Sequence, residues 1–196
     1  MALLLFLRNY NKGMIVLAGA SASGKTEVAK ELAKKYGITK VITTTTREMR
    51  VNEVNGRDYF FVSKEEFERM VQDGRFVEYT YFNDNLYGST KDQISDNKCV
   101  VIDPAGLRAY IGLKDPSIVT FFLDTSEETR YKRMLERGDD EEKAKKRIIH
   151  DREAFKAKNI ANVDFHISTE HTVVDEVTDD VYNKYIKILE QRGIKK

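Results

Sequence analysis

The sequence is poor in the residues that mark disulfide-bonded and metal-binding proteins. Its 196 residues include one cysteine, Cys99, together with three histidines, two prolines and no tryptophan. One cysteine excludes an intrachain disulfide, and the scattered histidines do not form a Cys/His metal cluster. Neither sign of charge dominates, since 33 Lys and Arg residues balance 32 Asp and Glu residues to a net charge of +1. This balance argues against a general nucleic-acid or membrane binder and leaves room for a local basic site.

Long apolar runs are also missing. The apolar run at residues 2–7 is too short to cross a membrane, no basic residue precedes it, and no small-residue cleavage site follows it. We interpret residues 1–13 as an N-terminal extension or an additional strand. The single cysteine fits a reducing compartment, so we expect a cytoplasmic protein.

The most informative motif is a glycine-rich run between a predicted strand and a predicted helix. It fits the pattern G-x-x-x-x-G-K-[ST], whose backbone N–H groups surround phosphate oxygens at a helix N-terminus. We expect Lys25 to reach the outer phosphates of a nucleotide and the Thr26 hydroxyl to hold Mg²⁺. The alternative, a glycine-rich turn without a ligand, fits the flanking strand and helix less well. The predicted ATP-binding residues are Gly19, Ala20, Ser21, Ala22, Ser23, Gly24, Lys25 and Thr26.

Strand-like and helical patterns alternate along most of the chain. Strand-like runs predict strands at residues 14–18, 41–46, 76–81, 99–103, 118–123 and 163–168. Helical patterns occupy residues 26–36, 64–72, 126–136, 141–161 and 173–191. This alternation predicts a three-layer α/β fold with a parallel central sheet covered by helices on both faces.

The texture of the chain changes between residues 47 and 96. Gly- and Asn-rich turns there surround short aromatic runs, which indicates an inserted small mixed β-sheet. We therefore predict a single domain. Its parts are a core at 14–46 and 97–190, an insertion at 47–96, a helical lid at 133–150 and the extension at 1–13.

The insertion carries a distinctive series of hydroxyl, arginine and tyrosine residues. The run TTTTREMRVNEVNGRDYFFVSKEEF begins at Thr43, and Phe76-Val77-Glu78 and Asn85-Leu86-Tyr87-Gly88-Ser89-Thr90 follow it. The run RMLERG begins at Arg133. Together with the phosphate loop, these motifs resemble the guanylate kinase family over about residues 14–190. The resemblance implies a phosphate-loop (P-loop) kinase fold with a GMP-binding subdomain and a lid.

The resemblance also implies that four residues of the insertion hold the phosphate of GMP. Arg47 and Arg50 can bind a phosphate dianion through paired hydrogen bonds, which lysine does poorly. Tyr59 and Tyr87 can donate phenolic hydrogen bonds to the same oxygens. The tyrosines also fit core aromatics of a small sheet, so this alternative stays open.

Recognition of the guanine base is assigned by the resemblance to Glu78. One carboxylate can accept both the N1–H and the N2 amino group of guanine, whereas adenine would oppose it with an acceptor. Thr43 and Ser89 match family positions whose hydroxyls help to bind the base. Taken alone, Glu78 also fits a solvated strand residue.

Asp103 follows a predicted strand, where P-loop enzymes often use an aspartate to hold Mg²⁺. The family usually shows D-x-D-x-Q-G at this place, and this chain has Val101-Ile102-Asp103-Pro104-Ala105-Gly106 instead. Asp103 can match either family aspartate, so we expect it to contact GMP, the metal ion or both. It also fits a helix N-cap before proline.

Arg133 and Arg137 are four residues apart and share a helix face. With Arg147, they match the family arginines that reach the ATP phosphates when the lid closes, although a solvated charged helix is an alternative. The predicted catalytic residues are Lys25, Arg47, Arg133, Arg137 and Arg147.

The resemblance implies transfer of the γ-phosphoryl group of ATP to GMP, with Mg²⁺ as cofactor. Small-molecule nucleotides are then the expected partners of a monomer or homodimer, without nucleic acid or membrane. One alternative is a kinase for dGMP or another phosphorylated small molecule on the same scaffold. The other is a non-catalytic guanylate-kinase-like domain that binds proteins, against which the intact Lys25 and Thr26 argue.

Overall fold

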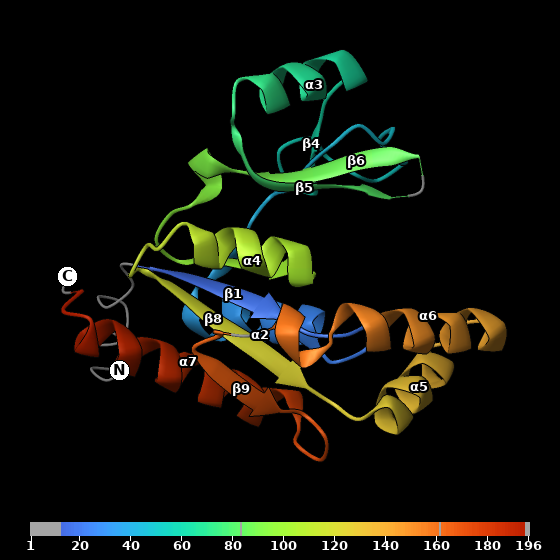
Figure 1. The fold of residues 1–196 in the computed structure, drawn as a ribbon, viewed down its shortest axis with the longest axis vertical. Coiled ribbons are helices and arrows are strands. Elements are labelled where there is room, and N and C mark those ends of the chain that lie inside the picture. The colour runs from blue at the N-terminus through green and yellow to red at the C-terminus, as the bar shows by residue number, and fades with distance from the viewer. Residues whose placement is uncertain (1–12, 83, 161, 195–196) are drawn as a thin grey trace.

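The computed structural model describes residues 13–82, 84–160 and 162–194 and contains two sheets, one above the other in Figure 1. The predicted N-terminal extension lies outside the described residues, except for Gly13. Helices cover the larger sheet, and the smaller sheet projects from it as a separate lobe.

The larger sheet has five strands in the order β2-β7-β1-β8-β9, and every pairing is parallel. Its strands are β1 (Met14–Ala18), β2 (Thr39–Lys40), β7 (Lys98–Ile102), β8 (Ile118–Asp124) and β9 (Phe165–Ser168). All residues of β1 are buried, as expected for a central strand with both faces covered. The predicted parallel sheet is therefore confirmed.

Helices pack on both faces of this sheet because the apolar side chains of β1 alternate between them. Ile15 and Leu17 belong to one cluster with residues of α2 (Lys25–Tyr36) and α7 (Val174–Gln191). Val16 belongs to the opposite cluster with Leu107 of α4 (Pro104–Gly112). The predicted three-layer α/β arrangement is confirmed.

The smaller sheet has the order β4-β3-β6-β5, with β3–β4 parallel and the other pairs antiparallel. Its strands are β3 (Thr44–Thr45), β4 (Phe60–Phe61), β5 (Phe76–Phe82) and β6 (Asn85–Thr90), and α3 (Lys64–Gln72) covers one face. Phe67 of α3 stacks on Phe76 of β5 at a ring-centroid distance of 4.4 Å. This lobe is the mixed sheet that the insertion predicts.

Two helices form the lid region, α5 (Glu127–Glu136) and α6 (Glu141–Ala154). They pack on each other through Met134, Ala144 and Ile148, and Ala22 of the glycine-rich loop joins this cluster. The helical lid therefore lies directly against the loop that precedes α2. Two short 3₁₀ turns, at Lys91–Gln93 and Ala157–Asn159, complete the described elements.

Two predicted elements are wrong in extent. Residues 41–46 do not form one strand: Val41 still donates to Cys99 O of the large sheet at 2.8 Å, whereas Thr44 and Thr45 pair with β6 of the small sheet. The chain crosses between the sheets here. The helix predicted to reach residue 161 ends at Ala154, whose carbonyl accepts a hydrogen bond from the Asn159 side chain at 2.9 Å.

The sequence indicates helix α4, at 104–112, only through the possible N-cap at Asp103. None of the described helices has the length and apolar character needed to cross a membrane.

Candidate active site

The glycine-rich loop joins the C-terminal end of β1 to the N-terminus of α2, as its motif predicts. Gly24 caps α2 with a φ of +91°, and Gly19 has a φ of +155°. A Cβ atom at Gly19 would lie 2.7 Å from both Leu123 O and Ser23 Oγ. Only glycine fits such a close approach between backbones, so the motif positions have a steric reason.

Lys25 lies inside this loop. Its Nζ donates to Gly19 O at 2.6 Å and to Ala20 O at 2.8 Å. Burial lowers the pKa of Lys25 to about 8, while the nearby Asp151 carboxylate acts in the opposite direction. A charged ammonium is thus held in the loop, where an incoming anion would stabilise its protonated form.

Two cavities meet at the loop. The first cleft, of about 460 Å³, runs from the loop to the small sheet, and the second cleft, of about 380 Å³, lies between the loop and the lid region. Lys25 lines both. The first cleft includes Gly19, Ser21, Lys40, Thr43, Tyr59, Glu78, Thr80, Tyr87, Ser89, Asp103, His150 and Asp151. The second includes Ala22, Ser23, Gly24, Thr26, Arg133, Arg137 and Thr169.

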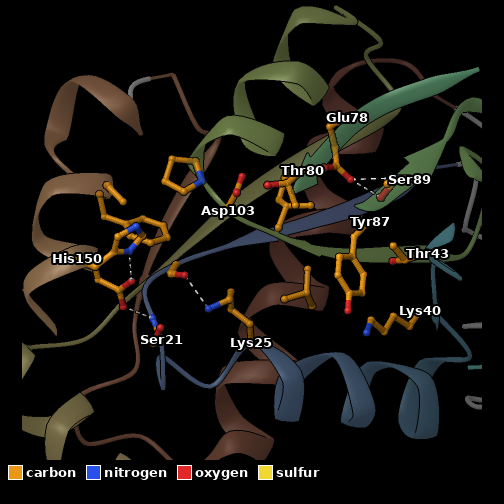
Figure 2. A pocket seen from close by; sticks show the side chains of 18 of the residues that line it. Ser21, Lys25, Lys40, Thr43, Glu78, Thr80, Tyr87, Ser89, Asp103 and His150 are labelled. Atoms are coloured by element: carbon orange, nitrogen blue, oxygen red, sulfur yellow. Dashed lines mark hydrogen bonds and ion pairs between the residues drawn. The ribbon is translucent and has the colours of Figure 1, made fainter. Parts of the chain in front are cut away.

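Glu78 projects from β5 into the first cleft beside Ser89 of β6 (Figure 2). Its Oε1 accepts from Ser89 N at 3.1 Å and from Ser89 Oγ at 2.6 Å. Burial raises the pKa of Glu78, and the bonds from Ser89 partly offset this. Its Oε2 accepts no hydrogen bond from the residues that the structure describes, so it can receive donors from a ligand.

Thr43 and Thr80 line the end of the first cleft that contains Glu78, on opposite sides of it (Figure 2). Thr43 is a predicted residue, and Thr80 was missed. The signal for Thr80 was available, because residues i and i+2 of a strand share a face and Glu78 precedes it by two. Lys40, at the end of β2, also lines the cleft without a motif that predicts it.

Arg47 lies beside the predicted tyrosines but is bound to neighbouring residues. Its Nη2 donates to Glu53 at 2.6 Å and its Nη1 to Glu48 O at 2.6 Å. Its guanidinium lies 5.4 Å from the ring centroid of Tyr59, which contacts Tyr87 edge-on at 6.2 Å. Both tyrosines line the first cleft, so the structure brings Arg47 to the edge of the cleft.

Arg50 stands further out, with an exposed side chain. Its backbone N–H donates to Glu53 Oε2 at 2.8 Å, so Glu53 joins both predicted arginines. The pKa of Glu53 is lowered, first by the hydrogen bond from Arg47 and then by that from Arg50 N. All predicted GMP-binding residues other than Arg47 and Arg50 line the first cleft.

Asp103 lines the first cleft and also caps α4, since it accepts from Gly106 N at 2.8 Å. The helix-cap alternative is therefore correct, and it does not remove the carboxylate from the cleft. Its electrostatic effect on Glu78 is to raise the pKa of that carboxyl. Thr26, the other predicted metal ligand, lines the second cleft.

The three predicted lid arginines gather at the second cleft and next to it. Arg133 donates to Thr169 O at 2.6 Å and to Ala22 O at 3.4 Å. Arg137 and Arg147 both contact the carboxylate of Asp139, at 2.5 and 3.3 Å. Arg137 lines the cleft, and Arg147 is exposed nearby.

Comparison with known proteins identifies relatives over most of the chain. A family model described as guanylate kinase matches residues 11–191. The guanylate kinase of Anaplasma phagocytophilum (strain HZ) is 31% identical over 87% of this chain and 84% of its own length. The guanylate kinase of Clostridioides difficile (strain 630) is 34% identical over 66% of each chain.

A solved structure agrees with these relatives. The crystal structure of guanylate kinase from Anaplasma phagocytophilum has a TM-score of 0.59 and 27% identity, covering 90% of this chain and 86% of that one. The family match spans both sheets, the lid region and both clefts described above. On this evidence, the chain belongs to the guanylate kinase family.

Proposed function

We propose that this protein transfers the γ-phosphoryl group of ATP to GMP, giving ADP and GDP. The observation that carries the proposal is the first cleft, which has Lys25 at one end and the Glu78–Ser89 pair at the other. A nucleoside monophosphate in this cleft would place its base at Glu78 and its phosphate toward the loop. The relatives' names support the same assignment.

The base end is suited to guanine. Glu78 Oε1 is held by Ser89, and Oε2 remains for ligand donors. The adjacent N1–H and N2–H₂ of guanine supply such donors, and adenine would leave the buried carboxylate without them. Thr43 and Thr80 add hydroxyls at the same end of the cleft.

The phosphate end requires a rearrangement of Arg47. In the described structure the Arg47 guanidinium forms an ion pair with Glu53. We propose that the GMP phosphate, a stronger acceptor with more charge, takes the place of Glu53 as the partner of Arg47. Tyr59, Tyr87 and Arg50 would bind the same phosphate. Phosphoryl transfer requires the acceptor oxygen to lie in line with the γ-phosphate of ATP, which we place in the second cleft.

Transfer needs no protein nucleophile or strong base, because the acceptor phosphate oxygen is already anionic. That oxygen forms a bond to the γ-phosphorus while the bond between the γ-phosphorus and the β–γ bridging oxygen breaks, and the bridging oxygen leaves as part of ADP. Lys25, Arg133 and Arg137 line the second cleft and would neutralise the charge that spreads over the transferring group. Arg147 would join them through a movement of the lid.

ATP is expected to bring Mg²⁺, which neutralises its phosphates. The Thr26 hydroxyl fits this role, since it lines the second cleft at the start of α2, and Mg²⁺ usually takes few protein ligands beside phosphate and water. Asp103, whose carboxylate lines the first cleft, is the second residue that would help to hold the ion.

The test is an ADP-release assay with ATP, Mg²⁺ and each nucleoside monophosphate in turn, including dGMP. We expect GMP to be the best acceptor, and an identically purified Lys25→Met protein serves as the blank for contaminating kinases. A preference for a non-guanine acceptor contradicts the proposal.

Domain boundaries, a monomeric or homodimeric state and a cytoplasmic location stay predictions.

A further inference from the structure

A buried ion pair lies against the phosphate loop, and the proposed mechanism does not use it. Arg130 of α5 and Asp151 of α6 have side chains that are 5% and 8% exposed, and Arg130 Nη1 lies 3.1 Å from Asp151 Oδ2. Asp151 Oδ2 also accepts a hydrogen bond from Ser21 N at 2.7 Å. Arg130 Nη1 lies 3.5 Å from Ser21 O, and its Nε donates to Thr125 O at 3.3 Å. The pair therefore engages both backbone polar groups of Ser21.

Burying such a pair costs free energy, because both charges lose their hydration. The attraction between the two charges offsets this cost only when their geometry is good. Asp151 also places a negative charge in the cleft where phosphates are expected to bind. Arg130 compensates this charge directly. A contribution to stability is therefore a weak explanation for the pair, and its contacts with the backbone of Ser21 are a stronger one.

The loop segment around Ser21, which the pair contacts, lies between the two clefts. Gly19 and Ser21 line the first cleft, and the loop from Ala22 onward lines the second. The Gly19 and Ala20 carbonyls accept from Lys25, and Ala22 packs into the lid cluster. In Figure 2, Ser21 and Lys25 lie side by side below His150 of α6. Three charged side chains, from α2, α5 and α6, thus fix this short segment.

We propose that Asp151, supported by Arg130, is a positioning residue for phosphoryl transfer. It sets the backbone of Ser21, and with it the place of Lys25 between donor and acceptor. The proposal rests on the proposed kinase function. It assigns a role to a residue that no motif singled out.

The direct test replaces Asp151 with asparagine. Asp151→Asn keeps an oxygen that can accept from Ser21 N–H but removes the charge that compensates Arg130. We expect kcat to fall about 10- to 100-fold, because a displacement of about 1 Å at a reacting group costs on the order of 10²-fold in rate. KM for ATP and for GMP should change by less than about threefold, since the cleft walls that bind both nucleotides remain.

Asp164 provides a matched control. Its carboxylate accepts from a backbone N–H, that of Thr120, at 2.8 Å and pairs with Arg192, away from the loop. Asp164→Asn should lower Tm while kcat of the folded enzyme stays within about twofold of wild type. Equal losses of kcat in both variants would mean that Asp151 acts only through stability.

A double variant separates positioning from folding more sharply. Arg130→Met with Asp151→Leu leaves no unpaired buried charge, and such replacements are often neutral or stabilising. We expect its Tm to recover while kcat stays low. Recovery of kcat together with Tm would overturn the proposal. If Asp151→Asn fails to fold, this double variant carries the comparison of kcat with wild type.

A readout without turnover makes failure of this proposal distinguishable from failure of the proposed function. Amide hydrogen exchange of the ligand-free protein should be faster at Ser21 in Asp151→Asn than in wild type, and unchanged there in Asp164→Asn. If wild type does not phosphorylate GMP, the function fails and this measurement still decides whether Asp151 holds Ser21. Unchanged exchange, or faster exchange with an unchanged kcat, would refute the positioning role.

Discussion

The two walls of the first cleft are built differently. On the phosphate-loop side, Lys25 is buried and bonded to the loop's own carbonyls, and Ser21 is held by Asp151. On the small-sheet side, Glu78 is fixed by Ser89, but Arg47 and Arg50 stand on the irregular segment between β3 and β4 and depend on Glu53. The loop and the Glu78 carboxylate are thus preorganised, whereas the proposed phosphate clamp, Arg47 with Arg50, would have to exchange the Glu53 carboxylate for the phosphate of the ligand.

The largest expected effect lies on the preorganised side. Lys25→Met removes the ammonium that both clefts share, so kcat should fall on the order of 10²–10³-fold, as for loss of one electrostatic stabiliser. Steady-state kinetics and a melting curve measure this, and Tm should change little. Near-wild-type turnover would mean that the loop does not serve phosphoryl transfer.

Glu78→Gln tests the other preorganised group. It keeps the size of the side chain but sets an amide donor against the guanine donors, which should reduce kcat/KM for GMP about ten- to a hundredfold. The kcat/KM for AMP should fall much less, so the ratio of kcat/KM for GMP to that for AMP becomes smaller. Glu68→Gln, the same change at an exposed position of α3 in the same lobe, is the matched control. If the ratio is unchanged in Glu78→Gln, another group reads the base.

These groups differ in how far the sequence could predict them. The phosphate loop could be predicted from its spacing between a strand and a helix, and Glu78 only from the family resemblance, because taken alone it also fits a solvated strand residue. Both line the clefts that the structure shows. Asp151 could not be found that way, because it meets Ser21 only through the packing of α6, 130 positions away in the chain. The occupation of Arg47 by Glu53 was equally invisible, since side-chain partners on an irregular segment leave no periodic signal.

The fold shows the same division. A continuous apolar run such as β1 predicts its strand correctly, whereas residues 41–46 read as one strand-like run and contact two sheets. The end of α6 depends on Asn159 reaching back to Ala154 O, a contact that local periodicity does not encode.

The clamp side should respond more mildly and selectively. Arg47→Lys keeps the charge but loses the paired geometry, so KM for GMP should rise about tenfold while KM for ATP changes little. Calorimetric titration of each nucleotide checks the same point at equilibrium. Arg57→Lys, which alters an exposed arginine paired with Asp58, is the control. Equal losses for ATP and GMP would place Arg47 in support of the fold.

The smallest expected effect is a pH dependence that distinguishes the two walls without a mutation. Burial lowers the pKa of Lys25 to about 8, so its charge is present below that pH and is lost as the pH rises through it. Because kcat/KM reports the free enzyme, kcat/KM for ATP should hold steady below pH 7.5 and fall up to about tenfold by pH 9. The other charges that act on Lys25 are Asp151 of α6, which raises its pKa, and Arg130 of α5, which lowers it. Asp151→Asn should therefore move the decline to lower pH. Since the Arg47 guanidinium stays charged throughout this range, the clamp side should contribute no such decline, and a profile that is flat to pH 9.5 would mean that Lys25 keeps its proton in the free enzyme.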